Sequence, residues 1–524
     1  MSFNTSASTT PAPYSALAIG RDPVPFDGSC LNELYYQYPS NSSATVNSGI
    51  PSFNGVEMNF DMRVPSNCRV RLDKSYVQIT GHAGTIALDT TAIPVSASIP
   101  WNSYTMLNKA EIQLNQSTTI LESVSQQYGD GIMVKMLTRY SKQALESKSD
   151  RFFTPCIESR RDISMPYVAP VAAAYTVLTN PATVAPAPGT GSLLTTAPVD
   201  EVNGLSPESA ARSANWLNAG AGAAGTVSVS KNLYFSDMFD SCNVPSAFFL
   251  QFVRLRVTPK QVNEIIFDSN IPATPCGFWI TSMTVFLSMT QLTEGSIAEQ
   301  IKLIQENQTV FQQSFAAYDA KQTGHESGGS QQYTAVKNLQ AFVTLIKSTA
   351  PQTGGLIGNI ADRRNGVNQY QYVYGFTLPG ATATTPAIAG VSQYQYRYQN
   401  TLSPQYPVSV ALTAGTIRTN TNLYALYQEL TSRTADKELA PVLSAHEMLQ
   451  PPVAVNGNVD GYDTNPYVMF AAQFFPDEAS FHSSMAGGSL DAVISGGGPT
   501  SVIYVQIRTS LVEIRGDTMV YVLI

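Results

Sequence analysis

The sequence is poor in charged residues. Only 13% of its 524 residues are Asp, Glu, Lys or Arg, against a usual share of about 25%. The formal net charge is −8, and no long run of Lys and Arg occurs. Because non-specific affinity for nucleic acid comes from clustered basic residues, we expect no specific nucleic-acid binding. The most basic stretch, Lys148 to Arg161, also contains Asp150 and Glu158. We interpret it as a solvated polar loop, with a phosphate-binding patch as the minor alternative.

The sequence also lacks the features of secreted and membrane-spanning proteins. Residues 1–20 contain no basic segment followed by an apolar one, and about 18 consecutive apolar residues occur nowhere. We therefore expect the protein to fold inside a cell without a secretory signal, and contact with a membrane stays open. The sequence has five cysteines, Cys30, Cys68, Cys156, Cys242 and Cys276, and none of them form a C-x-x-C pair. We therefore expect neither a disulfide framework nor a zinc cluster.

Motifs for nucleotide binding, metal binding and nucleophilic catalysis are missing as well. There is no G-x-x-x-x-G-K-[ST] loop, and the glycines at 487–488 and 496–498 are interpreted as turns. His446-Glu447 begins like a zinc-protease helix, but Gln450 stands where the second histidine is required. No nucleophile motif accompanies any of the four histidines, which are His82, His325, His446 and His482.

One carboxylate pair, Asp460 and Asp463, is a weak candidate for glycoside hydrolysis. A calcium or turn role fits these two residues better, and an ordinary polar loop fits better still. Arg515-Gly516-Asp517 matches a cell-adhesion tripeptide, but its place between two β runs favours a hairpin turn. We therefore expect no enzyme and no catalytic, cofactor-binding or metal site.

Alternating apolar and polar residues dominate what is present. From Val56 to Val64 every second residue is apolar, which is the pattern of a strand with one buried face. No regular helix separates successive strand-like runs, so an antiparallel sandwich is favoured over a parallel α/β sheet. Further strands are predicted at Cys68–Thr80, Ala110–Leu121, Ile132–Leu137, Phe248–Val257, Phe278–Leu292, Ser501–Leu511 and Thr518–Ile524.

The length of the chain and its less regular segments predict two domains. A chain of 524 residues is long enough for at least two cores. Apolar residues at helical spacing after a capping box predict a helix over Ser296–Ala320, followed by a Gly-rich segment, and a second helix is expected within Asn422–Leu449. An elaborated loop or a flexible insertion is expected at Tyr167–Gly225, with a counterpart at Gly375–Thr416 in the second half. The predicted order is an extended arm (1–52), a first domain (53–293, with the long loop at 167–225), a helical and Gly-rich connection (294–332) and a second domain (333–524).

This layout resembles the double jelly-roll major capsid proteins of viruses, especially those of virophages and Polinton-like viruses. The segment Ile99-Pro100-Trp101-Asn102-Ser103 through Asn115 is similar to the early strands of the first jelly roll in that family, and Phe278–Leu292 and Ser501–Ile524 are similar to the closing strands of each domain. The resemblance implies two consecutive eight-stranded jelly-roll β-sandwiches, with a few helices in the connections.

Membership of that family would imply a structural subunit of an icosahedral capsid. Three chains would form a pseudo-hexameric trimer, trimers would contact neighbouring capsomers and penton or minor capsid proteins, and the protein would be found in the virion. A surface low in charge and rich in Tyr and Phe agrees with packing against neighbours. The main alternative is a carbohydrate-binding or adhesive β-sandwich protein, and an enzyme on a jelly-roll scaffold is the third.

Overall fold

The structure is a computed structural model of the full chain. Elements and contacts are described for the following residues: 30–47, 50–85, 97–98, 103–114, 120–124, 128–141, 144, 148, 229–243, 252–265, 267–268, 276–306, 309–325, 330–336, 338–347, 391–409, 422–434, 470–474, 488–496, 500–515 and 520–523. The expected loop at 167–225 lies outside these residues, as do His446, Asp460 and Asp463.

The first half of the chain forms a sandwich of two four-stranded antiparallel sheets. One sheet has the order β1 (Cys30–Pro39), β12 (Cys276–Leu292), β5 (Cys68–Thr85), β9 (Val229–Tyr234). The other has the order β4 (Met58–Arg63), β10 (Phe252–Pro259), β7 (Leu107–Leu114), β8 (Ile120–Val124).

The second half repeats this arrangement. One sheet has the order β13 (Thr309–His325), β20 (Thr500–Arg515), β15 (Leu339–Lys347), β18 (Phe470–Gln473), and β21 (Val520–Leu523) also pairs with β20. The other has the order β14 (Ser330–Val336), β19 (Gly488–Gly496), β16 (Val391–Tyr398), β17 (Thr401–Ser409).

Both sandwiches have the strand order of a jelly roll. With β21 left aside, when the eight strands of each sandwich are counted in chain order, one sheet reads 1-8-3-6 and the other reads 2-7-4-5. This interleaving of early and late strands is what two Greek keys folded over each other produce. The prediction of two consecutive jelly-roll sandwiches is therefore confirmed by the sheets themselves, and the second sandwich carries β21 as a ninth strand.

Residues that alternate along the strands form the two cores. In β4 the predicted alternation is confirmed, because Met58, Phe60 and Met62 are fully buried and the residues between them are not. In the second jelly roll Tyr394 and Tyr396 of β16 point inward, and each hydroxyl donates to a backbone oxygen across the core, at 3.2 Å from Ala471 and 3.1 Å from Phe470 respectively. These bonds satisfy phenol groups that would be costly to bury unpaired.

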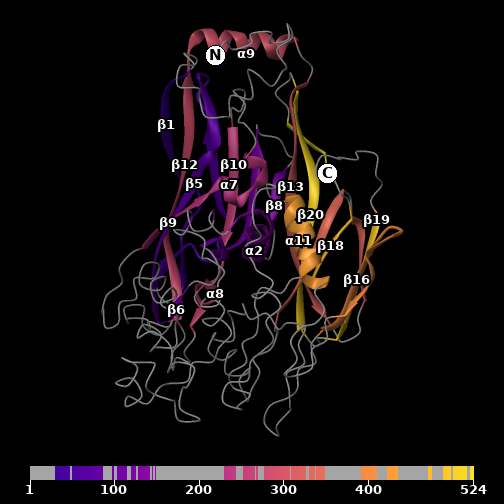
Figure 1. The fold of residues 1–524 in the computed structure, drawn as a ribbon. Coiled ribbons are helices and arrows are strands. Elements are labelled where there is room, and N and C mark those ends of the chain that lie inside the picture. Colours follow the sequence, from indigo (N-terminus) through magenta and orange to yellow (C-terminus); the bar gives the residue numbers. More distant parts are fainter. Residues whose placement is uncertain are drawn as a thin grey trace, which may run out of the picture.

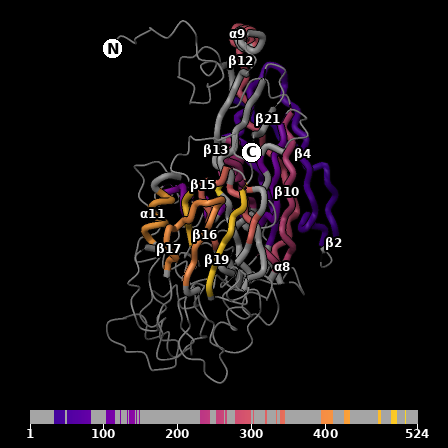
Figure 2. Tube along the Cα trace, turned by 90° about the vertical axis from the view of Figure 1, so that its right-hand side faces the viewer, coloured from indigo at the N-terminus to yellow at the C-terminus, as the bar shows by residue number. Residues whose placement is uncertain are grey.

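Short elements connect the strands and join the jelly rolls. The helix α9 (Glu294–Glu306) lies across one end of the molecule, between the end of β12 and the start of β13 (Figure 1). The helix α2 (Tyr128–Arg139) lies between the jelly rolls, and α11 (Asn422–Thr434) packs on β18 and against α2. Figure 2 shows α11 on the side of the second jelly roll. The remaining short elements are β2 (Thr45–Asn47), β3 (Ile50–Ser52), β6 (Ala97–Ser98), η1 (Ser103–Met106), α7 (Phe235–Met238), η4 (Asp240–Asn243), α8 (Val262–Ile265) and β11 (Phe267–Asp268).

Several sequence-based boundaries are wrong. The predicted helix over Ser296–Ala320 ends at Glu306, and the rest of that range belongs to β13. The second jelly roll therefore begins with β13 rather than at residue 333, and the Gly-rich segment falls between β13 and β14, inside the domain. The prediction failed because β13 has buried residues on both faces near Tyr318. Its apolar residues therefore do not alternate with polar ones as they would in a strand with one exposed face.

The predicted arm and the second predicted loop also contain strands. Residues 30–39 are not an arm but β1, which pairs with β12 along its length. The sequence analysis missed this strand because a Tyr-rich edge strand has only a weak alternation of apolar and polar residues. The loop expected at Gly375–Thr416 contains β16 and β17. The single run predicted over Ala110–Leu121 is divided between β7 and β8, which pair with each other.

Candidate functional site: the joint between the jelly rolls

The helix α2, whose described side chains are almost all buried, separates the two jelly rolls. It packs against β7 and η1 of the first jelly roll and against β13 and α11 of the second. The sequence analysis predicted a strand at Ile132–Leu137, and this prediction is wrong. A short apolar run that is buried on every side shows neither a period of 2 nor one of 3.6, so the pattern could not distinguish strand from helix.

Two hydroxyl groups of the second jelly roll contact the last turn of α2. The Tyr427 hydroxyl of α11 donates to the carbonyl oxygen of Leu137 at 2.7 Å, and both residues are fully buried. Carbonyls in the last turn of a helix have no partner inside the helix, so Tyr427 satisfies a group that would otherwise be buried unpaired. The hydroxyls of Thr138 and Tyr318 lie 3.5 Å apart.

A buried ion-pair cluster fastens α2 to the segment Phe235–Asn243. The Lys135 ammonium lies 2.8 Å from Oδ1 of Asp240 and donates to the carbonyl oxygen of Asp237 at 3.0 Å. Arg139 pairs with the same Asp240 oxygen. Since Lys135 and Asp240 are both almost completely buried, each charge depends on the other to offset its desolvation.

Asp237 is the second anion of the cluster, and it accepts bonds on both carboxylate oxygens. Lys148 lies 2.6 Å from Oδ1, Tyr140 donates to Oδ1 at 3.0 Å, and Tyr104 donates to Oδ2 at 2.8 Å. Burial and the charge of Asp237 raise the pKa of Tyr140 well above its ordinary value. Lys148, which belongs to the predicted polar loop, is therefore an ion-pair partner at the joint.

The third carboxyl group, Glu122 of β8, has no cation within ion-pair distance among the described residues. Its Oε2 accepts from the backbone N–H of Ser241 at 3.0 Å and from the Ser241 hydroxyl at 2.9 Å. Burial, followed by the charge of Asp240, raises the pKa of Glu122 to about 7, although Lys135 and the Ser241 bonds act in the opposite direction.

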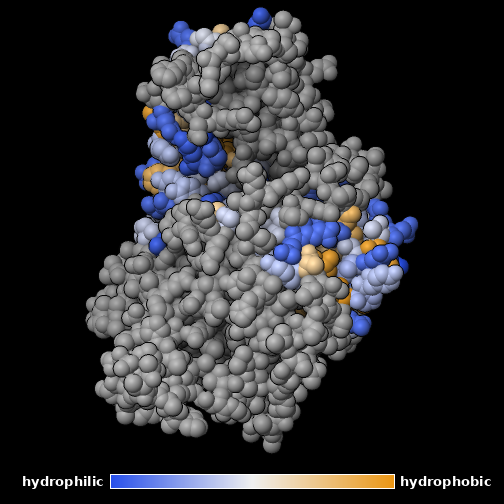
Figure 3. Space-filling view, in the orientation of Figure 1, coloured by the Kyte–Doolittle hydropathy of each residue, from blue (hydrophilic) through white to orange (hydrophobic). Residues whose placement is uncertain are grey.

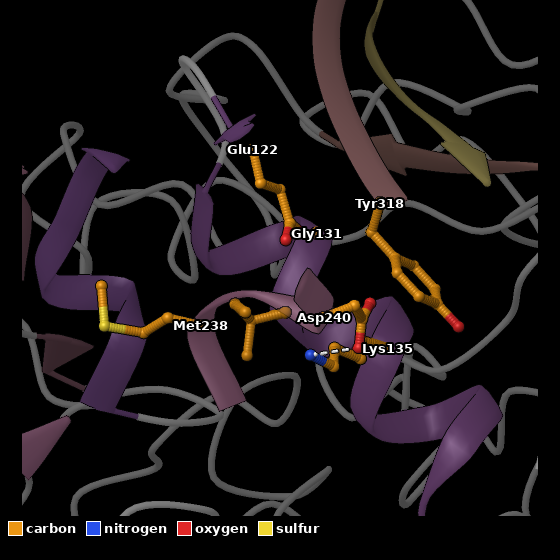
Figure 4. Close-up of a pocket in the computed structure, with 7 residues that line it drawn as sticks. Glu122, Gly131, Lys135, Met238, Asp240 and Tyr318 are labelled. Carbon is orange, nitrogen blue, oxygen red and sulfur yellow. Dashed lines mark ion pairs between the residues drawn. The ribbon is translucent and has the colours of Figure 1, made fainter. Parts of the chain in front are cut away.

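A small cavity of about 10 Å³ lies where these groups meet, large enough for about one water molecule. Figure 4 shows side chains from β8, α2, the Met238–Asp240 segment and β13 around it. Within the described part of the chain, no group donates to Oδ2 of Asp240. The lining residues are Glu122, Gly131, Ile132, Lys135, Met238, Asp240 and Tyr318.

Sequence reasoning missed this cluster. A usable signal existed, because Lys135 interrupts an apolar run and Asp237 and Asp240 interrupt an aromatic one. Isolated charges within apolar runs are seldom buried unless they are paired.

His82 is buried in β5 and stacks on Trp279, with ring centroids 5.6 Å apart, which is a packing role. Across the residues that the structure describes, no three His, Cys, Asp or Glu side chains gather in a way that could hold a metal ion. None of the described helices is long and apolar enough to cross a membrane.

Large apolar side chains are exposed mainly on strands at the two sides of the molecule. The edge strand β1 exposes Tyr35 and Tyr36, whereas β17, the edge strand of the far sheet, exposes Leu402 and Tyr406. Hydrophobic and hydrophilic residues mix at both of these sides in the space-filling view (Figure 3). The other exposed large apolar residues among those described are Val46, Ile301 and Val493, the last of which lies on β19 in the same sheet as β17.

Searches with the sequence find no matching family model and no matching curated protein. Solved structures with a similar chain path do exist. A chain of the Sputnik virophage, determined by cryo-EM, is 10% identical and aligns over 94% of this chain and 88% of its own length, with a TM-score of 0.48. The mavirus major capsid protein is 9% identical over 93% of this chain and 89% of its own, with a TM-score of 0.43.

A chain of the PBCV-1 virus capsid is 7% identical over 94% of this chain and 97% of its own, with a TM-score of 0.44. The strand order of each sandwich identifies the fold independently of these structures. The orders 1-8-3-6 and 2-7-4-5 occur twice in succession, so the chain has the double jelly-roll fold.

Proposed function

We propose that this protein is the structural subunit of a viral icosahedral capsid and that it self-assembles as trimers. The observation that carries the proposal is the tandem repeat of one jelly roll in a single chain, held together by the buried joint around α2. Two similar sandwiches per chain give a trimer six similar lobes, which is the outline needed to tile a shell with pseudo-hexagonal units.

The distribution of exposed apolar residues supports self-association. Two different surfaces carry exposed apolar side chains: the β1 surface, with Tyr35 and Tyr36, and the β17 surface, with Leu402 and Tyr406. In an assembly, the β1 surface of one copy would contact the β17 surface of the next copy. A contact of this head-to-tail kind produces a ring when the rotation closes. Tyrosine is suited to such contacts because it buries a large area with little loss of side-chain entropy.

The proposal places the protein in the virion, with neighbouring capsomers and penton or minor capsid proteins as partners. The similar solved structures, which are those of a virophage, a major capsid protein and a virus capsid, agree with this role. No catalytic role is assigned to the chain.

Light scattering on the purified chain, followed by electron microscopy, tests the proposal. A mass near three times 56.5 kDa, or closed shells, is the expected result. A stable monomer at high concentration that binds glycans would contradict it and favour an adhesive sandwich.

A pair of variants sharpens this test. Tyr406→Ser removes a side chain that is 76% exposed on β17, and it should weaken trimer formation while leaving the thermal unfolding of the monomer unchanged. Val46→Ser, on the small β2 hairpin, removes a similarly exposed apolar group outside β1 and β17 and serves as the control. Equal effects of the two substitutions would show that β17 has no special part in assembly.

A further inference from the structure

Two carboxyl groups face the same small cavity at the joint. Glu122 comes from β8 and is 6% exposed, and Asp240 comes from η4 and is 2% exposed. Figure 4 shows both beside the cavity, with Tyr318 of the second jelly roll on another side. A bridging group in a cavity of about 10 Å³ can be no larger than one water molecule.

The cations of the joint are already engaged by the aspartates. Lys135 and Arg139 of α2 both pair with Oδ1 of Asp240, and Lys148 pairs with Asp237. The other titratable groups described near Glu122 are the Cys242 thiol of η4 and the Tyr318 phenol of β13, neither of which carries a positive charge. An ionised Glu122 would therefore have only the two Ser241 donors and the charge of Lys135, which lies beyond ion-pair distance, to offset its repulsion from Asp240.

A neutral Glu122 removes this conflict. Its carboxyl group keeps accepting from Ser241 on Oε2 and gains one O–H donor. Asp240 offers the matching acceptor, because Oδ2 is buried and receives no bond from any described residue. Two carboxyl groups in one desolvated site hold one proton between them more favourably than none.

We propose that Glu122 and Asp240 share one proton across the cavity, directly at the contact between the jelly rolls, and that loss of this proton loosens the joint. Tyr318 lines the cavity, and its hydroxyl also contacts the hydroxyl of Thr138, which lies one turn of α2 after Lys135. Charge repulsion inside the cavity therefore acts on the packing of β13 against α2.

The sign of the effect follows from the pKa of Glu122, which burial raises from its ordinary value of 4.5 to about 7. Between these values the folded chain holds a proton that the unfolded chain has lost, so stability falls as the pH rises through this range. For this shift the folding equilibrium should change roughly 10- to 100-fold between pH 5 and pH 8, in favour of the unfolded chain at the higher pH.

Glu122→Gln tests the proposal, because the amide keeps the acceptor for Ser241 and a donor toward Asp240 but cannot ionise. Glu111→Gln is the control: Glu111 on β7 is also 6% exposed, but it pairs with Lys109 at 2.8 Å and does not line the cavity. Chemical unfolding of the full-length chain is measured from pH 5 to pH 8. Between pH 5 and pH 8 the folding equilibrium constants of wild type and Glu111→Gln should fall by the same factor. The factor by which the constant of Glu122→Gln falls should be roughly 10-fold smaller.

Infrared difference spectroscopy supplies a readout that does not depend on the stability of the variants. Wild type should show the C=O stretch of a protonated carboxyl group that disappears near pH 7, and Glu122→Gln should lack this band. Hydrogen exchange of the α2 amides, corrected for intrinsic rates, should accelerate with pH in wild type more than in Glu122→Gln. Absence of the titrating band in wild type, or parallel pH profiles for Glu122→Gln and wild type, would overturn the proposal. All measurements use unassembled chains, so the result is independent of whether shells form.

Discussion

The hydroxyl of Tyr427 and the carbonyl oxygen of Leu137 form a 2.7 Å hydrogen bond that joins residues 290 positions apart and lies between the two jelly rolls. It connects α11, which packs on β18, with the last turn of α2. This bond is one of the specific polar contacts that fix how the second jelly roll sits on the first.

Tyr427→Phe should destabilise the folded chain by about 1–3 kcal/mol, because the Leu137 carbonyl is left buried without this donor. The loss is measured as a change in the free energy of unfolding by urea. Tyr406→Phe, which removes the hydroxyl of an exposed tyrosine, should have almost no effect in the monomer. Equal stability of Tyr427→Phe and wild type would show that the bond contributes nothing net.

Lys135→Met should be more damaging, with a loss of about 3–5 kcal/mol, because it removes one of the two cations that pair with the buried Asp240. The double variant Lys135→Met/Asp240→Asn should recover part of this loss, since it no longer buries the carboxylate of Asp240. Urea unfolding of both variants checks this. If the double variant is less stable than the single one, the unpaired charge is not the cause.

Gly81→Ala and Gly295→Ala should change stability in opposite directions. A Cβ on Gly81 would lie 2.4 Å from the backbone oxygen of Trp279 in the adjacent strand, so we expect a loss of about 1–3 kcal/mol. A Cβ on Gly295 meets nothing within 4 Å, and alanine in α9 should add up to about 1 kcal/mol. Thermal unfolding temperatures measure both effects, and a stabilised Gly81→Ala would contradict the close packing of β5 on β12.

Deletion of residues 1–29 and deletion of residues 1–52 should have different consequences. The longer deletion removes β1, which pairs with β12 from Cys30 to Pro39, and should destabilise the first jelly roll by several kcal/mol at about 0.5–1.5 kcal/mol per backbone hydrogen bond. The shorter deletion keeps this strand, and it is the variant suited to testing whether the N-terminal segment acts in shell formation. Circular dichroism and the unfolding temperature compare the two. Equal stability of the two deletions would show that β1 is dispensable.

Removal of residues 518–524 should destabilise the second jelly roll, because β21 pairs with β20 over Leu511–Ile514. Loss of β21 would leave part of β20 without its partner strand. Because β20 lies between β13 and β15, a disordered β20 would disrupt the whole sheet. A truncated chain that unfolds at the same temperature as the full chain would refute this prediction.

Much of the fold could be predicted where a strand has one buried face. The alternation at Val56–Val64 and the apolar runs that became β5, β10, β12 and β20 all correspond to strands, because a period of 2 needs no knowledge of the partner. The low charge, the length and the closing strands of each half also pointed to two sandwiches. For these features the sequence alone was sufficient.

The tertiary structure decided the elements that touch the joint. The segment Ile132–Leu137 is helical and Thr309–Ala320 lies largely in a strand, contrary to the predictions made from the sequence. The helix α2 packs between elements of both jelly rolls, and β13 packs against α2, β8 and η4 as well as pairing with β20, so neither segment keeps the pattern that a solvent-facing side creates. The proximity of Glu122, Lys135 and Asp240 is likewise a property of the fold, since they lie on separate elements. Sequence specifies periodicity within one element, whereas the partners of a buried charge are set by packing between elements distant in the chain.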